Sequence, residues 1–185
     1  MIKNISTYKL LLGVGLGTLI LLLIPLVAMQ FTNEVVWTLS DFIFAGILLS
    51  VTGSGFVFVL KKDDSNMYKI GMGIAILSTF LLIWVNLAVG LIGSENNLIN
   101  LSYFGVIGIG LIIAFLSRFK ATGMSYSSFG MAIGFVLIAV IALSSGMQNY
   151  PESSVLEILG VNAFFAVPFV LSGISFRNAV ADLKS

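Results

Sequence analysis

The chain of 185 residues contains no cysteine and no histidine. Without cysteine it can form no disulfide, no thiolate nucleophile and no Cys-ligated metal site. Without histidine it lacks the usual haem ligand, the side chain that most often carries protons near neutral pH, and most zinc sites. These absences exclude many classes of enzyme, and we predict a non-enzymatic protein with no catalytic residues, no metal and no cofactor.

Charged residues are also scarce. They make up only 9% of the chain, against about a quarter of a soluble protein. Hydrophobic residues make up 58%, and the mean hydropathy is +1.10. This composition predicts an integral membrane protein. We therefore expect the lipid bilayer as a partner. Because the net charge is only +1, we expect no nucleic acid.

Long apolar runs define the topology. A helix needs about 20 residues to cross a bilayer, and windows near this length give six spans separated by short connectors. We therefore predict one membrane domain over residues 1–185, an all-α bundle of six transmembrane helices with the second or third span near its centre. The predicted spans are 10–29, 39–60, 67–91, 101–116, 126–147 and 155–176.

The basic residues predict the orientation of the bundle. All nine fall on one side of a six-helix arrangement, and the first, third and fifth connectors contain none. Under the positive-inside rule both termini are then cytoplasmic. The basic residues are Lys3, Lys9, Lys61, Lys62, Lys69, Arg118, Lys120, Arg177 and Lys184, and the acids expected on the opposite side are Glu34, Asp41, Glu95, Glu152 and Glu157.

Capping patterns support these helix starts. Thr38 with Asp41 matches the S/T-x-x-D/E pattern just before an apolar run, and so does Ser154 with Glu157. On the basic side the expected caps are Ser65 or Asn66 for the third span and Ser125 or Ser127 for the fifth.

Small residues predict close helix packing, because they let backbones approach in lipid. Gly13 and Gly17 are four residues apart in the first span, as are Gly130 and Gly134 in the fifth. Asn86 and Asn162 share helix faces with small residues in the third and sixth spans. Both asparagines are therefore expected to point toward protein rather than lipid.

The stretch WVNLAVGLIGSENNLINLSY, residues 84–103, is the most polar segment between two spans. It places Asn86 in an apolar run, then two glycines that end a helix, then several amides and one acid. Together with polar residues of the second and sixth spans it gives a candidate polar cluster. The members of this cluster are Asp41, Asn86, Glu95, Asn97, Asn100 and Asn162.

Two interpretations of this cluster stand side by side. Asn86 and Asn162 either line a polar binding site or act as hydrogen-bonding links between helices, and the second is favoured because a buried amide needs partners in any case. Glu95, with Asn97 and Asn100, either offers oxygen ligands to a hard cation or is an exposed loop acid. A lone carboxylate among amides is a weak metal signal, which favours the loop acid.

Aromatic residues near the outer ends of spans predict an interfacial belt of the kind common in membrane proteins. Its expected members are Trp37, Trp84, Tyr103 and Tyr150.

The block WVNLAVGLIGSENN followed by NLSYFGV, with the Arg118-Phe119-Lys120 connector and Gly123-Met124 after it, resembles a group of small bacterial multi-pass membrane proteins of uncharacterised function. The likeness covers about a fifth of the chain. It implies a bacterial inner-membrane location and favours a role for Asn86, Glu95, Asn97 and Asn100.

Three functions are compatible with these features. The leading hypothesis is a non-enzymatic membrane module, either an accessory subunit of a larger assembly or a small homo-oligomer. The main alternative is a channel or carrier for a cation or small polar solute that uses the outer cluster. An intramembrane enzyme is disfavoured, because acid–base work would fall on carboxylates with no visible base or nucleophile beside them.

The predicted topology is tested by reporter fusions to each connector. A reporter fused at Glu95 is expected to lie outside the cytoplasm, because the third connector carries no basic residue. A cytoplasmic signal at that position would contradict the topology.

Overall fold

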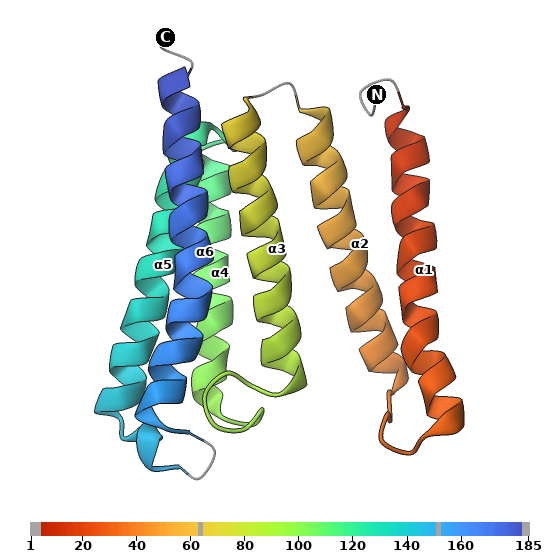
Figure 1. Ribbon diagram of the computed structural model, residues 1–185, viewed down its shortest axis with the longest axis vertical. Helices are drawn as coiled ribbons and strands as arrows, with labels where there is room; N and C mark the ends of the chain where they lie inside the picture. Colours follow the sequence, from red (N-terminus) through yellow and green to blue (C-terminus); the bar gives the residue numbers. More distant parts are fainter. Residues whose placement is uncertain (1–4, 63–64, 151–152, 183–185) are drawn as a thin grey trace. The chain divides into compact units, whose positions relative to one another are not determined.

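The computed structural model describes residues 5–62, 65–150 and 153–182. Within these ranges it contains no strand and six helices long and apolar enough to cross a membrane. The all-α class is confirmed, and the six helices indicate a multi-pass membrane protein. The helices are α1 (Thr7–Phe31), α2 (Leu39–Lys61), α3 (Asn66–Ala88), α4 (Leu101–Leu116), α5 (Ala121–Ser144) and α6 (Val155–Asp182), with 3-10 helices η2 (Leu98–Asn100) and η3 (Met147–Asn149) (Figure 1).

Helix boundaries differ most from the predicted spans in α5. It begins at Ala121 after Lys120, so Ser125 and Ser127 are not its caps. Both serines are buried inside the helix, where their Oγ atoms donate hydrogen bonds to the carbonyls of Gly173 (2.9 Å) and Gly110 (2.7 Å). The polar run at the start of α5 lowers its hydropathy, which is why an apolar window places the start too late.

The chain divides into two compact units, which we call the N-terminal unit (Met1–Asp63) and the C-terminal unit (Asp64–Ser185). Each is described by itself below. The single membrane domain over residues 1–185 stays a prediction.

The N-terminal unit is a pair of packed antiparallel helices, α1 and α2. A Cβ built on Gly53 would lie 2.6 Å from Val14 Cγ1, so glycine allows the two helices to approach. At one end of the pair Lys61 Nζ donates to the carbonyl of Ile5. At the other the predicted capping box is confirmed, because the Thr38 backbone N–H donates to the Asp41 carboxylate at 2.6 Å.

The C-terminal unit is a four-helix arrangement in which α3 packs on α6, α6 on α5 and α5 on α4 (Figure 1). Aromatic rings meet within its largely aliphatic core: the Phe135 ring stacks with Phe165 and Phe169 at centroid distances of 6.1 and 5.7 Å. Within this unit the central helices are α5 and α6, because each packs on two others. Small residues along α5 admit a neighbour on each side, whereas α3 packs mainly on α6. That the second or third span lies near the centre of the whole bundle stays a prediction.

Serine side chains satisfy backbone carbonyls inside this unit. Ser172 Oγ donates to the carbonyl of Gly71 (2.8 Å) and shares a hydrogen bond with Ser128 Oγ (3.1 Å). Ser172 and Ser128 are almost completely buried. Between apolar helices these bonds join α3, α5 and α6 without exposing a polar group to lipid.

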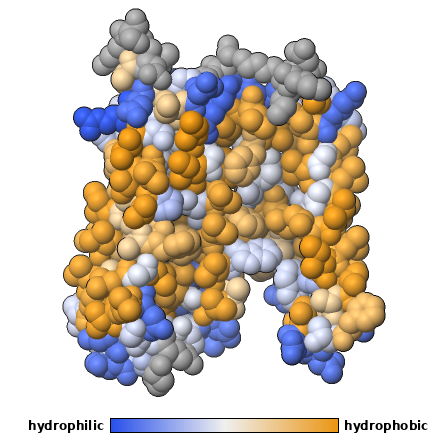
Figure 2. Space-filling view, in the orientation of Figure 1, coloured by the Kyte–Doolittle hydropathy of each residue, from blue (hydrophilic) through white to orange (hydrophobic). Residues whose placement is uncertain are grey.

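The outer surfaces of the helices suit a bilayer. Large apolar side chains such as Leu19, Phe44 and Ile112 are exposed by more than half. Figure 2 shows hydrophobic side chains over the middle of the helices and hydrophilic side chains at their ends. In water such exposure would be unfavourable, whereas hydrocarbon accepts it.

Gly134 is expected to be required for the packing of α5 on α4. A Cβ at this position would lie 2.7 Å from Val106 Cγ2, and a β-branched neighbour cannot easily turn away. Gly134→Ala should therefore lower the free energy of unfolding by about 1–3 kcal/mol. Thermal unfolding in detergent, followed by circular dichroism, measures this.

The matched control is Gly160→Ala in α6, where a Cβ would meet nothing within 4 Å. It should leave stability within about 1 kcal/mol, or raise it, because alanine favours helix. Equal effects of the two substitutions would contradict the packing account.

Candidate functional site

The connector between α3 and α4 follows a sharp turn at the end of α3. The helix ends at Ala88, and Gly90 and Gly93 take left-handed backbone conformations with φ of +73° and +65°. A Cβ at Gly90 would lie 2.8 Å from both Asn100 Nδ2 and the Ser94 carbonyl oxygen. Only glycine fits at this position, which brings the backbone of the connector against the side chain of Asn100.

The side-chain amide of Asn100 organises this connector. Its Oδ1 accepts hydrogen bonds from the backbone N–H groups of Leu91 (3.1 Å) and Ile92 (3.0 Å). Its Nδ2 donates to the carbonyls of Ile92 (3.3 Å) and Ser94 (3.0 Å). Asn100 is only 4% exposed, so its buried amide replaces water as the hydrogen-bond partner of these backbone groups.

Asn86 ties the end of α3 to the same place. Its Nδ2 donates to the backbone carbonyl of Asn100 at 3.0 Å, which fixes the orientation of the amide. Its Oδ1 then has no hydrogen-bond partner among the described residues, although the side chain is only 5% exposed. The predicted burial of Asn86 is confirmed, and one acceptor remains open to a donor from water or a ligand.

Asn162 makes the second buried link. Its Nδ2 donates to the Ile158 carbonyl within α6 (2.8 Å), and its Oδ1 accepts from the Tyr103 hydroxyl of α4 (3.2 Å). Both atoms of this amide are therefore engaged, and the side chain is 3% exposed. The predicted position of Asn162, facing protein, is confirmed.

Tyr103 does not belong to an interfacial aromatic belt. The side chain is completely buried, with its ring 5.8 Å from that of Phe135. The first turn of α4 directs it toward α5 and α6, where Asn162 satisfies its hydroxyl. For Trp37, Trp84 and Tyr150 the belt stays a prediction.

Asn97 and Glu95 occupy the outer part of the connector. Asn97 Oδ1 accepts from the Ile99 backbone N–H (3.2 Å), and its Nδ2 donates to Met147 Sδ (3.5 Å) in η3. Glu95 and Asn96 are exposed. In the described ranges no group of three or more acidic side chains is placed to hold a metal ion.

These contacts bear on the candidate cation site. The side-chain oxygens of Asn97 and Asn100 both face backbone N–H groups of the connector, so they are already used as acceptors. Asp41 belongs to the other unit, where its carboxylate caps α2. A single cluster made of Asp41, Asn86, Glu95, Asn97, Asn100 and Asn162 stays a prediction.

Sequence reasoning missed how much of the connector one residue holds. Asn100 stands directly before the fourth apolar span, a position that normally suggests a helix cap. It makes no side-chain cap for α4 and instead binds the chain before it. The sequence signal for this arrangement was the pair Gly90 and Gly93 ahead of Asn100, because glycine readily takes the left-handed conformation of a tight turn.

No protein-family model, curated protein or solved structure matches this chain. The resemblance to small bacterial membrane proteins stays a prediction.

Replacing Asn100 with alanine is expected to lower the free energy of unfolding by about 2–3 kcal/mol, because buried N–H and C=O groups lose their partners. Asn100→Asp should not recover the loss at neutral pH, because the buried carboxylate accepts from Leu91 and Ile92 but places its second oxygen against the carbonyl oxygens of Ile92 and Ser94. Thermal unfolding in detergent measures both.

The control for these variants is Asn96→Ala, an exposed amide in the same connector. It should leave the midpoint of unfolding nearly unchanged. If Asn100→Ala were as mild as Asn96→Ala, the role given to Asn100 would be wrong.

Proposed function

We propose that this chain is a non-enzymatic membrane module that works by associating with other membrane helices, as an accessory subunit of a larger assembly or as a small homo-oligomer. The use of the buried amides supports this proposal over a binding site. Hydrogen bonds within the C-terminal unit already occupy the side-chain oxygens of Asn97, Asn100 and Asn162. The helix surfaces are therefore the remaining places for contact with another molecule.

The observation that carries the proposal is a set of glycines with open space beside them. A Cβ built on Gly13 or Gly17 in α1, or on Gly105 or Gly108 in α4, meets no atom within 4 Å. Gly53 and Gly134, by contrast, are filled by neighbouring side chains. In lipid, small residues of this kind permit close approach of another helix, which supports an association surface.

The same proposal includes a bacterial inner-membrane location with both termini in the cytoplasm. Within each unit the described basic residues gather at one end of the helices, a distribution of the kind that the positive-inside rule describes. Of the described acids, Asp182 lies at this end of the C-terminal unit, and the others lie at the opposite end of their unit. Lys3, Lys184 and Glu152 lie outside the described residues. The basic end carries Lys9, Lys61 and Lys62 in the N-terminal unit and Lys69, Arg118, Lys120 and Arg177 in the C-terminal unit.

A channel or carrier for a cation or small polar solute is the second candidate. The observation that favours it is the buried Oδ1 of Asn86, which accepts no hydrogen bond from the described part of the chain. A solute with a hydrogen-bond donor or a cation would satisfy this acceptor. Glu95, exposed on the same connector, would attract such a solute electrostatically.

Association is tested by native mass spectrometry of the full chain extracted in mild detergent from its own membrane. We expect stoichiometric masses of other subunits or of further copies of the chain. The doubles Gly13→Leu with Gly17→Leu, and Gly105→Leu with Gly108→Leu, each fill one glycine face, and at least one should release the chain as a monomer. Gly160→Leu is the control, because it adds the same side chain at a solitary open glycine.

If the chain were monomeric in every preparation, the proposal that it works by association would be wrong. Liposome flux assays then decide the second candidate. Flux that Glu95→Gln abolishes supports a carrier, whereas flux indifferent to Glu95 and Asn86 excludes this version of it.

A further inference from the structure

Two buried amides of the C-terminal unit, those of Asn86 and Asn162, retain hydrogen-bonding capacity. The Asn86 Nδ2 donates to the Asn100 carbonyl at 3.0 Å, and this bond fixes which of the two polar atoms of the amide is the oxygen. That oxygen, Oδ1, is buried and accepts no hydrogen bond from the described residues. A buried acceptor without a donor is unfavourable, so a donor is needed beside it.

The second amide belongs to Asn162 in α6. Its Nδ2 carries two N–H groups, and one bond leaves this atom, to the Ile158 carbonyl at 2.8 Å. Its Oδ1 accepts from the Tyr103 hydroxyl, whose own oxygen can still accept a hydrogen bond. Within the described residues, this pair therefore retains one donor on Asn162 and one acceptor on Tyr103.

The packing of α3 on α6 brings the two amides to a similar height in the unit. The two helices are antiparallel, and Ser172 Oγ donates to the Gly71 carbonyl at 2.8 Å (Figure 1). About four turns separate Gly71 from Asn86, and about four turns separate Ser172 from Ile158. Asn86 therefore lies near the height of Ile158, the residue whose carbonyl the Asn162 amide contacts.

The first turn of α4 lies at the same place. Asn86 binds the carbonyl of Asn100, and Tyr103 follows about one turn later. Leu82, Tyr103 and Ile158 belong to one buried cluster, and none of them is exposed by more than 1%. The open groups of Asn86 and Asn162 are thus enclosed by side chains of α3, α4 and α6 that solvent does not reach.

From this arrangement we propose that one internal water molecule bridges Asn86 and Asn162. The water donates to Asn86 Oδ1, accepts from the second Nδ2–H of Asn162 and donates its other hydrogen to the Tyr103 hydroxyl oxygen. An internal water in a protein typically makes about three hydrogen bonds, and these three groups provide them. The site is independent of the association proposed above, and it occupies the acceptor that a transported solute would need.

Water suits these groups better than a metal cation does. A hard cation such as Ca²⁺ takes about six or more oxygen ligands. The acceptors available here are Asn86 Oδ1 and the Tyr103 hydroxyl oxygen, and the N–H of Asn162 would repel a cation. Water both donates and accepts, which matches the two acceptors and one donor.

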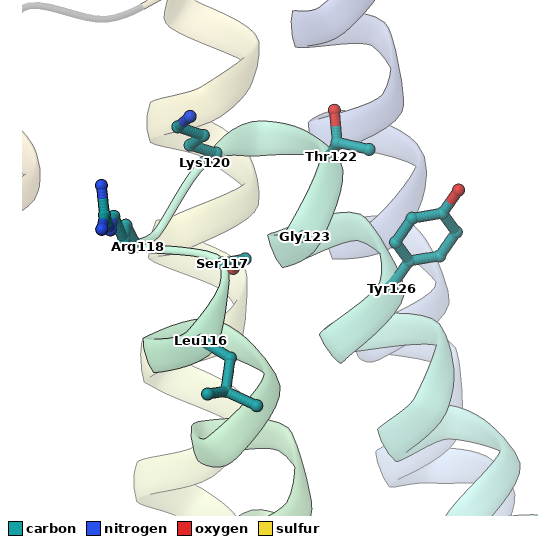
Figure 3. Close-up of a pocket in the computed structure, with 7 residues that line it drawn as sticks. All are labelled: Leu116, Ser117, Arg118, Lys120, Thr122, Gly123 and Tyr126. Atoms are coloured by element: carbon teal, nitrogen blue, oxygen red, sulfur yellow. The ribbon is translucent and has the colours of Figure 1, made fainter.

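The opposite end of the unit shows a different situation. Figure 3 shows an open depression beside the connector between α4 and α5, around which Arg118 and Tyr126 point in different directions. Every residue that lines it is half-buried or exposed. The enclosure and the buried open acceptor at Asn86 are what set the proposed water site apart from such a surface depression.

The test is water-selective NMR on the isotope-labelled full chain in deuterated detergent. A rotating-frame Overhauser peak opposite in sign to the diagonal shows that water lies beside a proton, and this sign excludes hydrogen exchange as its cause. We expect such a peak at the side-chain amides of Asn162 and Asn86. The Asn100 amide is the internal control, because it is equally buried and already donates to two carbonyls, so it should show no peak.

Two reciprocal variants test the bridge itself. Asn86→Leu removes the acceptor, so the water peak at Asn162 should be lost, and Asn162→Leu should abolish the peak at Asn86. Each variant is judged only if its backbone amide spectrum shows a folded chain, and either one suffices. The matched control is Asn96→Leu, the same substitution at an exposed amide, which should leave both peaks unchanged.

Four results would overturn the proposal. The first is the absence of a water peak at both amides of the unaltered chain, which needs no variant. The second is a peak of equal intensity at Asn100, which would mean general hydration of this end of the unit. The third is a peak at Asn162 that persists in folded Asn86→Leu. The fourth is a shift of the Asn86 and Asn162 amide resonances when sodium or potassium chloride replaces choline chloride, which would identify a cation in this place.

Discussion

The side-chain amide of Asn100 supplies hydrogen bonds that the connector between α3 and α4 cannot make to itself. A membrane protein must satisfy every backbone N–H and C=O group that leaves water, and irregular backbone at the edge of a bundle meets this requirement only with help. Here one asparagine accepts from Leu91 and Ile92 and donates to Ile92 and Ser94. The ends of α3 and α4 are held together as a result.

This constraint shapes what the rest of the C-terminal unit can do. Asn86 donates a hydrogen bond to the Asn100 carbonyl, and Asn162 accepts one from the Tyr103 hydroxyl. Most amide groups at this end of the unit therefore form hydrogen bonds within the unit. In that set of amides, the Asn86 Oδ1 has no hydrogen-bond partner among the residues that the structure describes. The surfaces with open space are those beside glycines such as Gly13, Gly17, Gly105 and Gly108.

The sequence sufficed for the six helices, because length and apolarity alone decide what crosses a bilayer. It also placed Asn86 and Asn162 toward protein and identified the capping box at Thr38. Sequence reasoning failed for polar side chains that could lie either at the end of a helix or buried between helices. Tyr103 near a span end looked interfacial but is buried, and Ser125 looked like a cap but binds a carbonyl of α6, since both outcomes depend on which helix lies opposite. No pattern in a single sequence specifies that neighbour.

Hydrogen exchange at the backbone amides of Leu91 and Ile92, measured by NMR on the full chain in detergent, tests the central role of Asn100 most directly. Both amides lie in a connector, where exchange is normally fast, but they donate to a buried side-chain oxygen. We predict that they exchange far more slowly than the amides of the exposed residues Glu95 and Asn96. Equally fast exchange at all four amides would contradict the account.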